Sequence, residues 1–259
     1  TPPKVCQFLV ECIRPEEHDI IYDLTYGKGD FFNYLPVEEN LYGTELDINA
    51  VKVARYLYPK ANLEYGDIRE YTPYVPADIV FGNPPFHLEW GTSENPISSQ
   101  MYYCKKAYQI LKPAGLLVVI VPESFLADPF TCGTDISMIN QCFNLILQFD
   151  LPVDTFRASG VETFRTKVMI LQKRSCYVTT RPYQIGKTAC ESSEEVYEEY
   201  IKPLLCEKRR NAPKIYLEGK NVNLNSCEDR KFLERTIKLL FDIKRNKNLR
   251  HRAGRCEAL

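Results

Sequence analysis

The sequence predicts an α/β fold built on a mostly parallel β-sheet, and three observations lead to this prediction. Short apolar segments alternate with segments of helical periodicity over the first 175 residues. Four of these apolar segments end in a polar residue, at the position where ligands bind in open α/β sheets. A chain of 259 residues with 44% hydrophobic content is also long enough to bury one substantial core with a small appendage.

Composition argues against several classes of protein. No apolar run approaches the roughly 18–20 residues that span a membrane, and the first residues lack the organisation of a signal peptide, so we expect a cytoplasmic protein. The ten cysteines are scattered without a Cys-x-x-Cys pair or a nearby histidine pattern. Neither a metal site nor a disulfide scaffold is therefore indicated. The chain starts without methionine and ends in a helix-like segment, so we expect it to be a domain of a longer polypeptide.

Charge divides the chain into two segments. Residues 1–175 carry 15 Lys and Arg against 22 Asp and Glu, whereas residues 176–259 carry 18 against 12. We predict an α/β domain over residues 1–175. Residues 176–259 are expected to be a basic, partly helical segment that serves as a partial target-recognition region, a scaffold or a linker. Its charge suits a polyanionic partner such as nucleic acid, and a solvated helical face explains the same charge equally well.

Periodicity and turn residues predict the order of the elements. Thr1 is expected to cap a first helix that runs to residue 13. Further helices are expected at 48–58, 98–111, 135–143, 193–210 and 228–245, and strands at 19–23, 41–47, 62–65, 77–83, 115–121, 145–150 and 167–173. Residues 179–188 are expected to form a short pair of strands.

A glycine turn follows the first expected strand. Asp23 ends that strand, and Gly27 and Gly29 follow it, which lets the backbone approach a ligand at the sheet edge. A dinucleotide site requires a third glycine so that a pyrophosphate can bind at the helix N-terminus, and Asp30 followed by two phenylalanines stands there instead. Because Asp23 and Asp30 repel phosphates, an adenosyl cofactor with a cationic sulfonium fits the turn better.

The next two expected strands also end in acidic residues. Glu45 lies 22 positions after Asp23, close to the spacing at which a carboxylate binds the hydroxyls of a ribose. Asp67 is placed to accept a hydrogen bond from the adenine amine, while Ile68 packs on the ring. Together with Asn83, four polar residues share one sheet edge, which favours an adenosine-type cofactor over solvated strand ends.

The fourth strand ends in the sequence Asn83-Pro84-Pro85-Phe86. Two prolines stop both a ladder and a helix at this point, so the chain must turn. The turn presents an amide, proline-flanked carbonyls and an aromatic ring, a set that suits a planar amino group. By itself the tetrapeptide is better explained by a rigid bend, and the three acidic strand ends shift the balance to a site.

Together these motifs resemble the S-adenosylmethionine-dependent DNA adenine-N6 methyltransferases, in the permutation in which the cofactor motifs precede the catalytic one. The resemblance covers roughly residues 1–175. It implies a Rossmann-like methyltransferase fold with a seven-stranded, mostly parallel sheet and an antiparallel last strand. It also implies that S-adenosylmethionine is the cofactor.

The resemblance further implies a role for each matching residue. Asn83, Pro84, Pro85 and Phe86 are the catalytic set. The implied cofactor-binding residues are Thr1, Asp23, Tyr26, Gly27, Gly29, Glu45, Leu46, Asp67, Ile68 and Asn83. A flipped-out base is held by Phe86 together with Phe156 as first choice or Phe164 as second, and either of the last two is equally well explained as an ordinary core aromatic. The implied partners are DNA and the further domains or subunits of a restriction-modification system.

Two alternatives stay open from the sequence. Asn-Pro-Pro-aromatic also occurs in enzymes that methylate a guanine amine in ribosomal RNA or a protein glutamine, since both present a planar amino group. A catalytically degenerate methyltransferase fold that serves as a binding subunit is the other alternative, because Lys28 and Asp30 depart from the usual glycine turn.

Overall fold

The computed structural model describes residues 1–73, 75–91, 96–127, 133–160, 163–190, 192–211, 214–217 and 220–223. The chain divides into two compact units, Thr1–Leu204 and Leu205–Leu259. The first unit continues past residue 175, where the sequence suggested a boundary, and includes residues 176–204. The helix expected at 228–245 lies outside the described residues.

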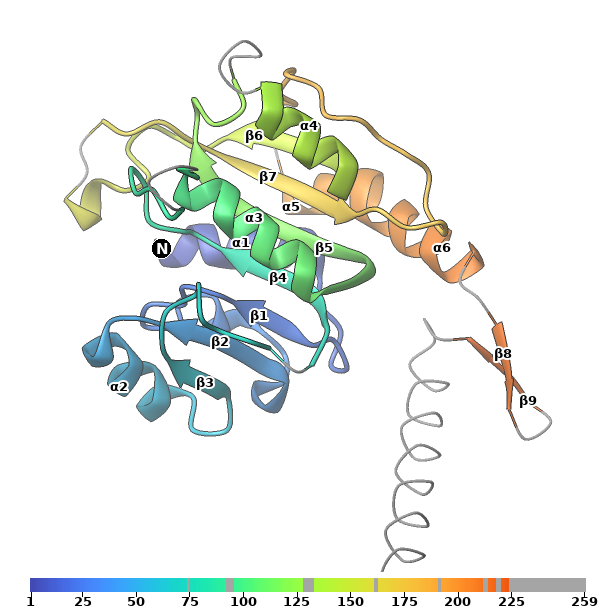
Figure 1. Cartoon of the computed structure of the whole chain (residues 1–259), viewed down its shortest axis with the longest axis horizontal. Coiled ribbons are helices and arrows are strands. Elements are labelled where there is room, and N and C mark those ends of the chain that lie inside the picture. The colour runs from blue at the N-terminus through green and yellow to red at the C-terminus, as the bar shows by residue number, and fades with distance from the viewer. Residues whose placement is uncertain are drawn as a thin grey trace, which may run out of the picture. The chain divides into compact units, whose positions relative to one another are not determined.

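A seven-stranded sheet forms the centre of the first unit (Figure 1). Its order is β3-β2-β1-β4-β5-β7-β6, and β7 alone runs antiparallel to its two neighbours. The strands are β1 Ile21–Asp23, β2 Leu41–Glu45, β3 Asn62–Tyr65, β4 Ala77–Gly82, β5 Leu111–Pro122, β6 Phe143–Asp150 and β7 Thr166–Lys173. The predicted mostly parallel sheet with an antiparallel last strand is confirmed.

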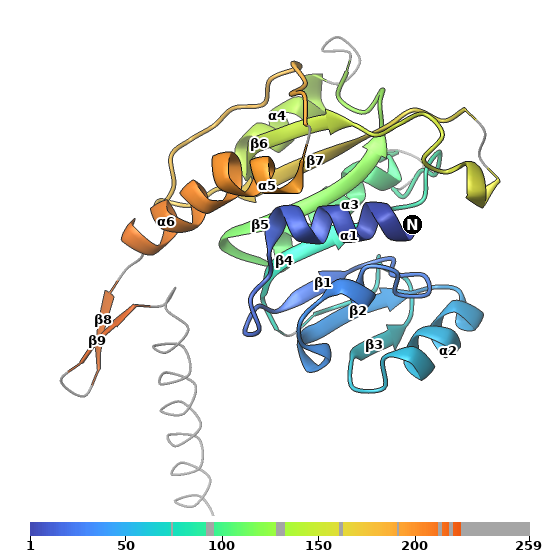
Figure 2. The ribbon, with the colours of Figure 1, turned by 180° about the vertical axis from the view of Figure 1, so that it is seen from behind.

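Helices pack on both faces of this sheet. α3 and α4 lie on one face, and α1 and α5 lie on the other (Figures 1 and 2). The α-helices are α1 Pro3–Ile13, α2 Ile48–Leu57, α3 Ser99–Ile110, α4 Gly133–Cys142, α5 Ser193–Glu195 and α6 Lys202–Asn211, and a π-helical stretch, Val196–Ile201, joins the last two. Single 3₁₀ turns occupy Phe32–Tyr34, Glu38–Asn40 and Arg157–Ser159, and the second unit contains a hairpin of β8 Lys214–Leu217 and β9 Lys220–Asn223.

The start of α1 differs from the prediction. Pro2, not Thr1, is the N-cap residue, and no side chain caps the helix. Prolines fit the first turn because their missing N–H groups would have no helical partner there. The Thr1 hydroxyl is consequently free to accept a hydrogen bond from Asn83 Nδ2 at 3.2 Å.

The predicted strand pair at 179–188 is wrong. No strand is formed there; the chain instead runs along β6, the edge strand of the sheet. Asn144 Nδ2 donates to the carbonyl of Thr179 at 2.7 Å, and Gln148 Nε2 donates to that of Gln184 at 2.7 Å. Buried amide side chains thus replace a regular ladder, which Pro182 would interrupt because it has no N–H.

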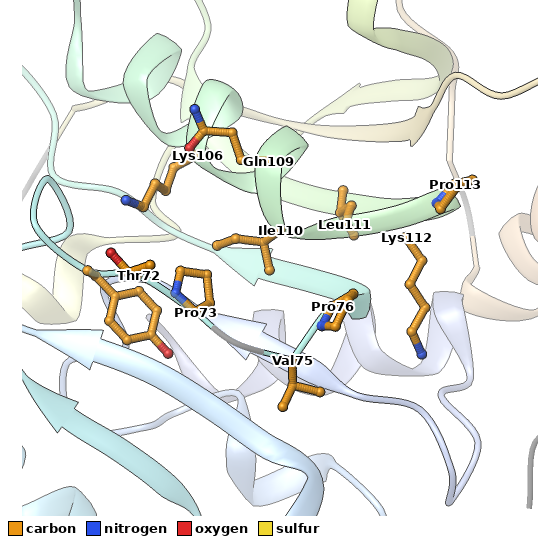
Figure 3. Close-up of a pocket in the computed structure, with 11 residues that line it drawn as sticks. Thr72, Pro73, Val75, Pro76, Lys106, Gln109, Ile110, Leu111, Lys112 and Pro113 are labelled. Carbon is orange, nitrogen blue, oxygen red and sulfur yellow. The ribbon is translucent and has the colours of Figure 1, made fainter. Parts of the chain in front are cut away.

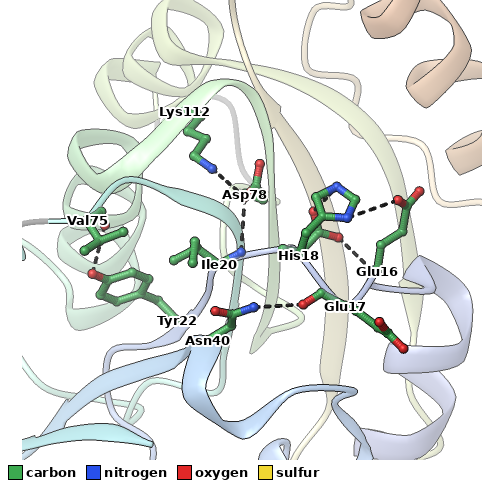
Figure 4. A network of polar contacts seen from close by, with 10 residues as sticks. Glu16, Glu17, His18, Ile20, Tyr22, Asn40, Val75, Asp78 and Lys112 are labelled. Atoms are coloured by element: carbon green, nitrogen blue, oxygen red, sulfur yellow. Dashed lines mark hydrogen bonds and ion pairs between the residues drawn. The ribbon is translucent and has the colours of Figure 1, made fainter. Parts of the chain in front are cut away.

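Polar groups at the amino edge of the sheet are paired with one another (Figure 4). The buried Asp78 carboxylate accepts from Lys112 Nζ at 2.6 Å and from the backbone N–H of Ile20 at 3.1 Å. The Tyr22 hydroxyl donates to the Val75 carbonyl at 2.8 Å. These contacts join β1, β4 and β5, and they set the register from which the carboxyl ends of the strands project.

Candidate functional site

A cavity of about 560 Å³ lies at the carboxyl edge of the sheet. Its volume falls in the range of small-molecule sites. The residues that line it are Leu24, Thr25, Glu45, Leu46, Asp47, Gly66, Asp67, Ile68, Arg69, Asn83, Pro85, Leu88 and Trp90. The ends of β1, β2, β3 and β4 all contribute, so the structure brings together residues that are distant in the sequence.

Glu45 closes one end of this cavity. Its Oε2 atom accepts from the N–H of Gly27 at 2.8 Å, and its Oε1 atom accepts from Leu46 at 2.8 Å and Asp47 at 2.9 Å. Asp47 in turn caps α2 by accepting from the N–H of Asn49 at 2.8 Å. The glycine turn is therefore tied to the second strand through a carboxylate on the cavity wall.

Asp67 is held by Arg69, which the sequence reading did not single out. Both Asp67 oxygens accept from Arg69 Nε at 3.0 Å, and Oδ1 also accepts from the Arg69 backbone N–H at 2.8 Å. The Arg69 guanidinium lowers the pKa of the Asp67 carboxyl by hydrogen bonding and by its charge. Asp67 is thus an oriented anion on the cavity wall.

Asp23 is buried and immediately precedes Leu24 and Thr25, which line the cavity. It accepts from the N–H of Thr25 at 3.1 Å and lies 3.4 Å from the Tyr103 hydroxyl, and no ion pair of Asp23 is formed within the described ranges. Burial, reinforced by the charge of Glu45, raises the pKa of Asp23 to about 7. A cation placed here would favour the ionised carboxylate.

Tyr103 joins the first and fourth strand ends. Its hydroxyl donates to the Phe81 carbonyl at 2.6 Å and accepts from the Leu24 N–H at 3.0 Å. A Cβ atom at Gly82 would lie 2.2 Å from this hydroxyl, so the tyrosine requires a glycine just before Asn83. One buried side chain of α3 therefore positions both the glycine turn and the Asn-Pro-Pro-Phe turn.

Asn83 carries an unsatisfied acceptor. Its Nδ2 group is engaged with Thr1, whereas its Oδ1 atom is buried without a hydrogen-bond partner. Thr25 Oγ1, which follows the neighbouring strand β1 and also belongs to a cavity-lining residue, is likewise buried and unpartnered. Leaving a buried acceptor unpaired costs about 1–3 kcal/mol, which points to a ligand that donates a hydrogen bond here.

The two prolines of the turn differ in their environment. Pro85 lines the cavity, and its carbonyl accepts from Ser99 Oγ at 2.5 Å and from Gln100 Nε2 at 3.1 Å. These bonds attach the turn to the first residues of α3. Pro84 is buried, and its carbonyl accepts no hydrogen bond from the part of the chain that the structure describes.

The three predicted base-stacking residues form one aromatic cluster. The Phe86 ring stacks on Phe164 with centroids 5.0 Å apart, and it meets Phe156 edge-on at 6.5 Å. His87 meets Phe164 edge-on at 5.3 Å. The cluster therefore joins the Asn-Pro-Pro-Phe turn to the segment between β6 and β7.

Five of the predicted cofactor residues do not line the cavity. Thr1 and Asp23 contact residues that do, and the Gly27 N–H bonds Glu45. Tyr26 is buried, and its hydroxyl donates to the Glu64 carbonyl at 3.0 Å. Gly29 packs against Tyr58, whose ring would lie 2.7 Å from an added Cβ atom.

Trp90 is a wall residue that the sequence reading missed. It lines the cavity and meets Tyr102 edge-on at 5.7 Å, and its backbone N–H donates to the Ile97 carbonyl at 2.7 Å. The segment after Phe86 therefore folds back over the cavity. The sequence signal for such a wall was one leucine and one tryptophan, Leu88 and Trp90, within an otherwise polar segment.

Other cavities contain none of the predicted catalytic residues. One of about 500 Å³ lies between residues 71–73, 75 and 76 and the end of α3, where Lys106 and Lys112 flank an apolar centre (Figure 3). Another of about 710 Å³ lies between the start of α1 and the end of β6. In the described part of the chain, no group of three or more His, Cys, Asp or Glu is arranged to hold a metal, and no helix is long and apolar enough to cross a membrane.

Solved structures of methyltransferases share this architecture. A suggested class I S-adenosylmethionine-dependent methyltransferase from Listeria monocytogenes matches with a TM-score of 0.60 at 17% identity, over 79% of this chain and 68% of its own. The M protein of the type I restriction enzyme EcoKI matches with a TM-score of 0.57 at 18% identity, over 71% and 46%. The chain has the class I methyltransferase fold. A modification subunit of a suggested type I restriction enzyme from Vibrio vulnificus also has this fold, with a TM-score of 0.56 at 17% identity over 88% and 60%.

Sequence comparison gives a more distant likeness. No protein-family model matches the chain. Over 216 residues, 78% of the chain, it is 22% identical to Defense against restriction protein B of Escherichia phage P1. The chain spans 9% of the length of that relative.

Proposed function

We propose that this chain transfers a methyl group from S-adenosylmethionine to the N6 amine of a flipped-out adenine in DNA. The observation that carries the proposal is the buried, unpartnered Asn83 Oδ1 atom beside an aromatic cluster, at the edge of a cavity with acidic walls. An amine that donates to Asn83 would satisfy this acceptor, and an aromatic ring attached to the amine would pack on Phe86.

The cavity suits the proposed cofactor. Glu45, Asp47 and Asp67 line it, Asp23 immediately precedes two of its lining residues, and Arg69 is the single Lys or Arg among those lining residues. This surplus of carboxylates favours a cationic ligand and disfavours phosphates. When bound, S-adenosylmethionine would supply an electrophilic methyl group: the bond from its sulfur to that methyl would break as the bond to the amine nitrogen forms, the neutral thioether S-adenosylhomocysteine would leave, and the amine would release one proton to solvent.

Each cofactor residue has a proposed part. Thr1, Asp23, Tyr26, Gly27 and Gly29 form or support the end that receives the methionine moiety. Glu45 and Leu46 bind the ribose and adenine, and Asp67 and Ile68 bind the adenine. Since Glu45 already accepts three backbone N–H groups, a ribose must share that carboxylate with the glycine turn.

The catalytic turn acts on the target amine. The lone pair of an adenine amine is delocalised into the ring, so the nitrogen is a weak nucleophile until its hydrogens are bound. Asn83 Oδ1 and the Pro84 carbonyl accept these hydrogens, which localises the lone pair on the nitrogen. Alignment of the reactants supplies most of the acceleration, worth roughly 7–11 kcal/mol in favourable cases. The base reaches the turn by leaving the duplex, at a cost of about a few kcal/mol.

The relatives support DNA as the substrate. Two of the structures with this fold are type I restriction-modification subunits, and the phage relative is named for defence against restriction. We propose that residues 1–175 carry the methyltransferase activity, and that residues 176–259 contact DNA, the rest of a longer polypeptide or restriction-modification subunits.

The test measures methyl transfer and cofactor binding separately. Asn83→Ala should abolish transfer of labelled methyl groups to genomic DNA and leave the affinity for S-adenosylmethionine within about threefold. Asn49→Ala is the matched control, because the Asn49 side chain is exposed on α2. Trp90 is the only tryptophan of the chain, so its fluorescence reports ligand binding in the cavity.

The same assay distinguishes the alternatives. Labelling of ribosomal RNA or of release factor, with genomic DNA unlabelled, would replace the substrate and keep the chemistry. Absence of S-adenosylmethionine binding by the protein would favour a degenerate binding subunit. Equal loss of transfer and of binding in Asn83→Ala would remove Asn83 from the catalytic role.

A further inference from the structure

One face of the Phe86 ring is covered by another aromatic ring. Phe164 lies on this face with a centroid separation of 5.0 Å and an interplanar angle of 27°. Phe156 meets the same ring edge-on, at 6.5 Å and 88°. Phe164 is thus the one ring of the cluster that occupies a parallel stacking position on Phe86.

The separation leaves no room for a third ring. Two stacking contacts, each with carbon atoms about 3.5 Å apart, require about 7 Å between the outer rings. A planar substrate cannot enter between Phe86 and Phe164 at 5.0 Å. A substrate ring that stacks on this face of Phe86 must displace Phe164.

Phe164 is placed so that displacement is feasible. Its side chain is only partly buried, and it lies between the exposed residues Thr163 and Arg165, just before β7 begins at Thr166. His87, with a φ of 58°, packs edge-on against it. Left-handed backbone is uncommon at a residue other than glycine, and such conformations cluster at ligand-binding turns.

We infer that Phe164 is a placeholder, which occupies the stacking position in the free protein and is displaced by a planar heteroaromatic amine of the substrate. This inference rests on the proposed function and adds a selectivity to it. A purine replaces the lost Phe86–Phe164 stack with one of its own, whereas the small amide of a glutamine side chain does not. Phe164 would therefore select nucleobases against protein amides at the same Asn83 acceptor.

The test uses a substrate that needs no base flipping. The probe is a single-stranded thymidine oligonucleotide with one 2-aminopurine, whose fluorescence falls when the base stacks on a ring. Phe164→Ala should bind this probe about 2- to 10-fold more tightly than the unmodified protein, because the competing stack is gone. Phe164→Leu, which keeps most of the apolar bulk, should show the same direction.

Two further variants make the sign of the result interpretable. Phe8→Ala is the matched control: Phe8 is also half-buried and meets another phenylalanine, Phe149, at 6.0 Å. It should leave probe affinity unchanged, and Phe86→Ala should remove the fluorescence change. Unchanged or weaker binding by Phe164→Ala would overturn the placeholder role, because Phe164 would then be inert or a second stacking wall.

The proposed function can survive that failure. Methyl transfer to DNA that depends on Asn83 would stand even if Phe164→Ala bound the probe normally. If probe binding did not depend on Phe86 in any variant, both base recognition at this cluster and the placeholder inference would fail. The two experiments therefore separate the two ideas.

Discussion

The amino edge and the carboxyl edge of the parallel strands each hold a buried aspartate, and the two carboxylates differ in their hydrogen-bond partners. At the amino edge, the Asp78 carboxylate has a lysine at 2.6 Å and a backbone N–H at 3.1 Å (Figure 4). At the carboxyl edge, Asp23 has one backbone N–H at 3.1 Å and a distant hydroxyl. At the amino edge, the buried carboxylate is therefore paired with a lysine and a backbone N–H, whereas the carboxyl edge provides Asp23 with no ion pair among the described residues.

Around β1 to β4, the contrast extends to neutral polar atoms. Asn83 Oδ1 and Thr25 Oγ1, both at the carboxyl edge, are buried without partners, while the Tyr22 hydroxyl at the amino edge is paired with Val75. Proteins retain unsatisfied buried groups where stability is traded for a role. This difference around β1 to β4 supports the proposal that the carboxyl edge binds a ligand.

The largest expected effect is on stability at the amino edge. Asp78→Ala leaves Lys112 Nζ and the Ile20 N–H without their acceptor, and should lower the free energy of unfolding by about 3 kcal/mol in urea titrations. Adding Lys112→Met should recover part of the loss, since no uncompensated charge then remains. Asp154→Ala, at an exposed position, is the control. A loss below about 1 kcal/mol would show that the amino edge does not depend on this pair.

Asp23→Asn should have the opposite effect on stability. The raised pKa means that the native state is favoured when Asp23 is protonated, so stability decreases as pH rises from about 4 to 7. The neutral amide removes this penalty, less the cost of its own unpaired N–H groups. We expect a gain of about 1–2 kcal/mol at pH 8, or roughly 3–6 °C in Tm, and no gain at pH 5. A lower Tm at pH 8 would remove the contrast with Asp78.

Several of these features follow from local sequence. Glu45, Asp67 and Asn83 come together because each ends a parallel strand, and strand ends meet at one edge by topology. The alternation of apolar segments with segments of helical periodicity predicts the sheet and the helices that cover it. A strand or a helix that buries one face repeats its apolar residues with a period of 2 or 3.6. The position of the cavity could thus largely be predicted from the order of the strands.

The side-chain contacts that support the cavity could not be predicted from local sequence. Tyr103 lies four residues before Ala107, so periodicity predicts its burial, but its bonds to residues about 20 and 80 positions earlier depend on tertiary packing. The partnership of Arg69 with Asp67 depends on side-chain direction, and Trp90 reaches the cavity through a loop. Local patterns do not encode these directions.

Cofactor affinity should depend on pH through Asp23. Below about pH 7 the carboxyl is mostly protonated in the free protein, and a cationic ligand must drive its ionisation. The dissociation constant for S-adenosylmethionine should therefore rise by up to about tenfold per pH unit below 7. Trp90 fluorescence titrations between pH 5.5 and 8 measure this, and Asp23→Asn should bind weakly with no such slope. A flat profile in the unmodified protein would separate Asp23 from the cationic part of the ligand.

The smallest expected effect concerns Arg69. Its guanidinium pairs with the Asp67 carboxylate at the carboxyl edge, much as Lys112 pairs with Asp78 at the amino edge. Arg69→Gln removes the bonds to both Asp67 oxygens, and the pKa of Asp67 should return toward its usual range. Stability should change by less than about 1 kcal/mol, since half of the Arg69 side chain is exposed to solvent. Affinity for S-adenosylmethionine should fall about three- to tenfold, because Asp67 loses its fixed orientation toward the adenine. Lys60→Gln breaks an exposed pair with Glu39 far from the cavity and should leave affinity unchanged. If Arg69→Gln changed stability more than affinity, the Asp67–Arg69 pair would belong with the structural pairs of the amino edge.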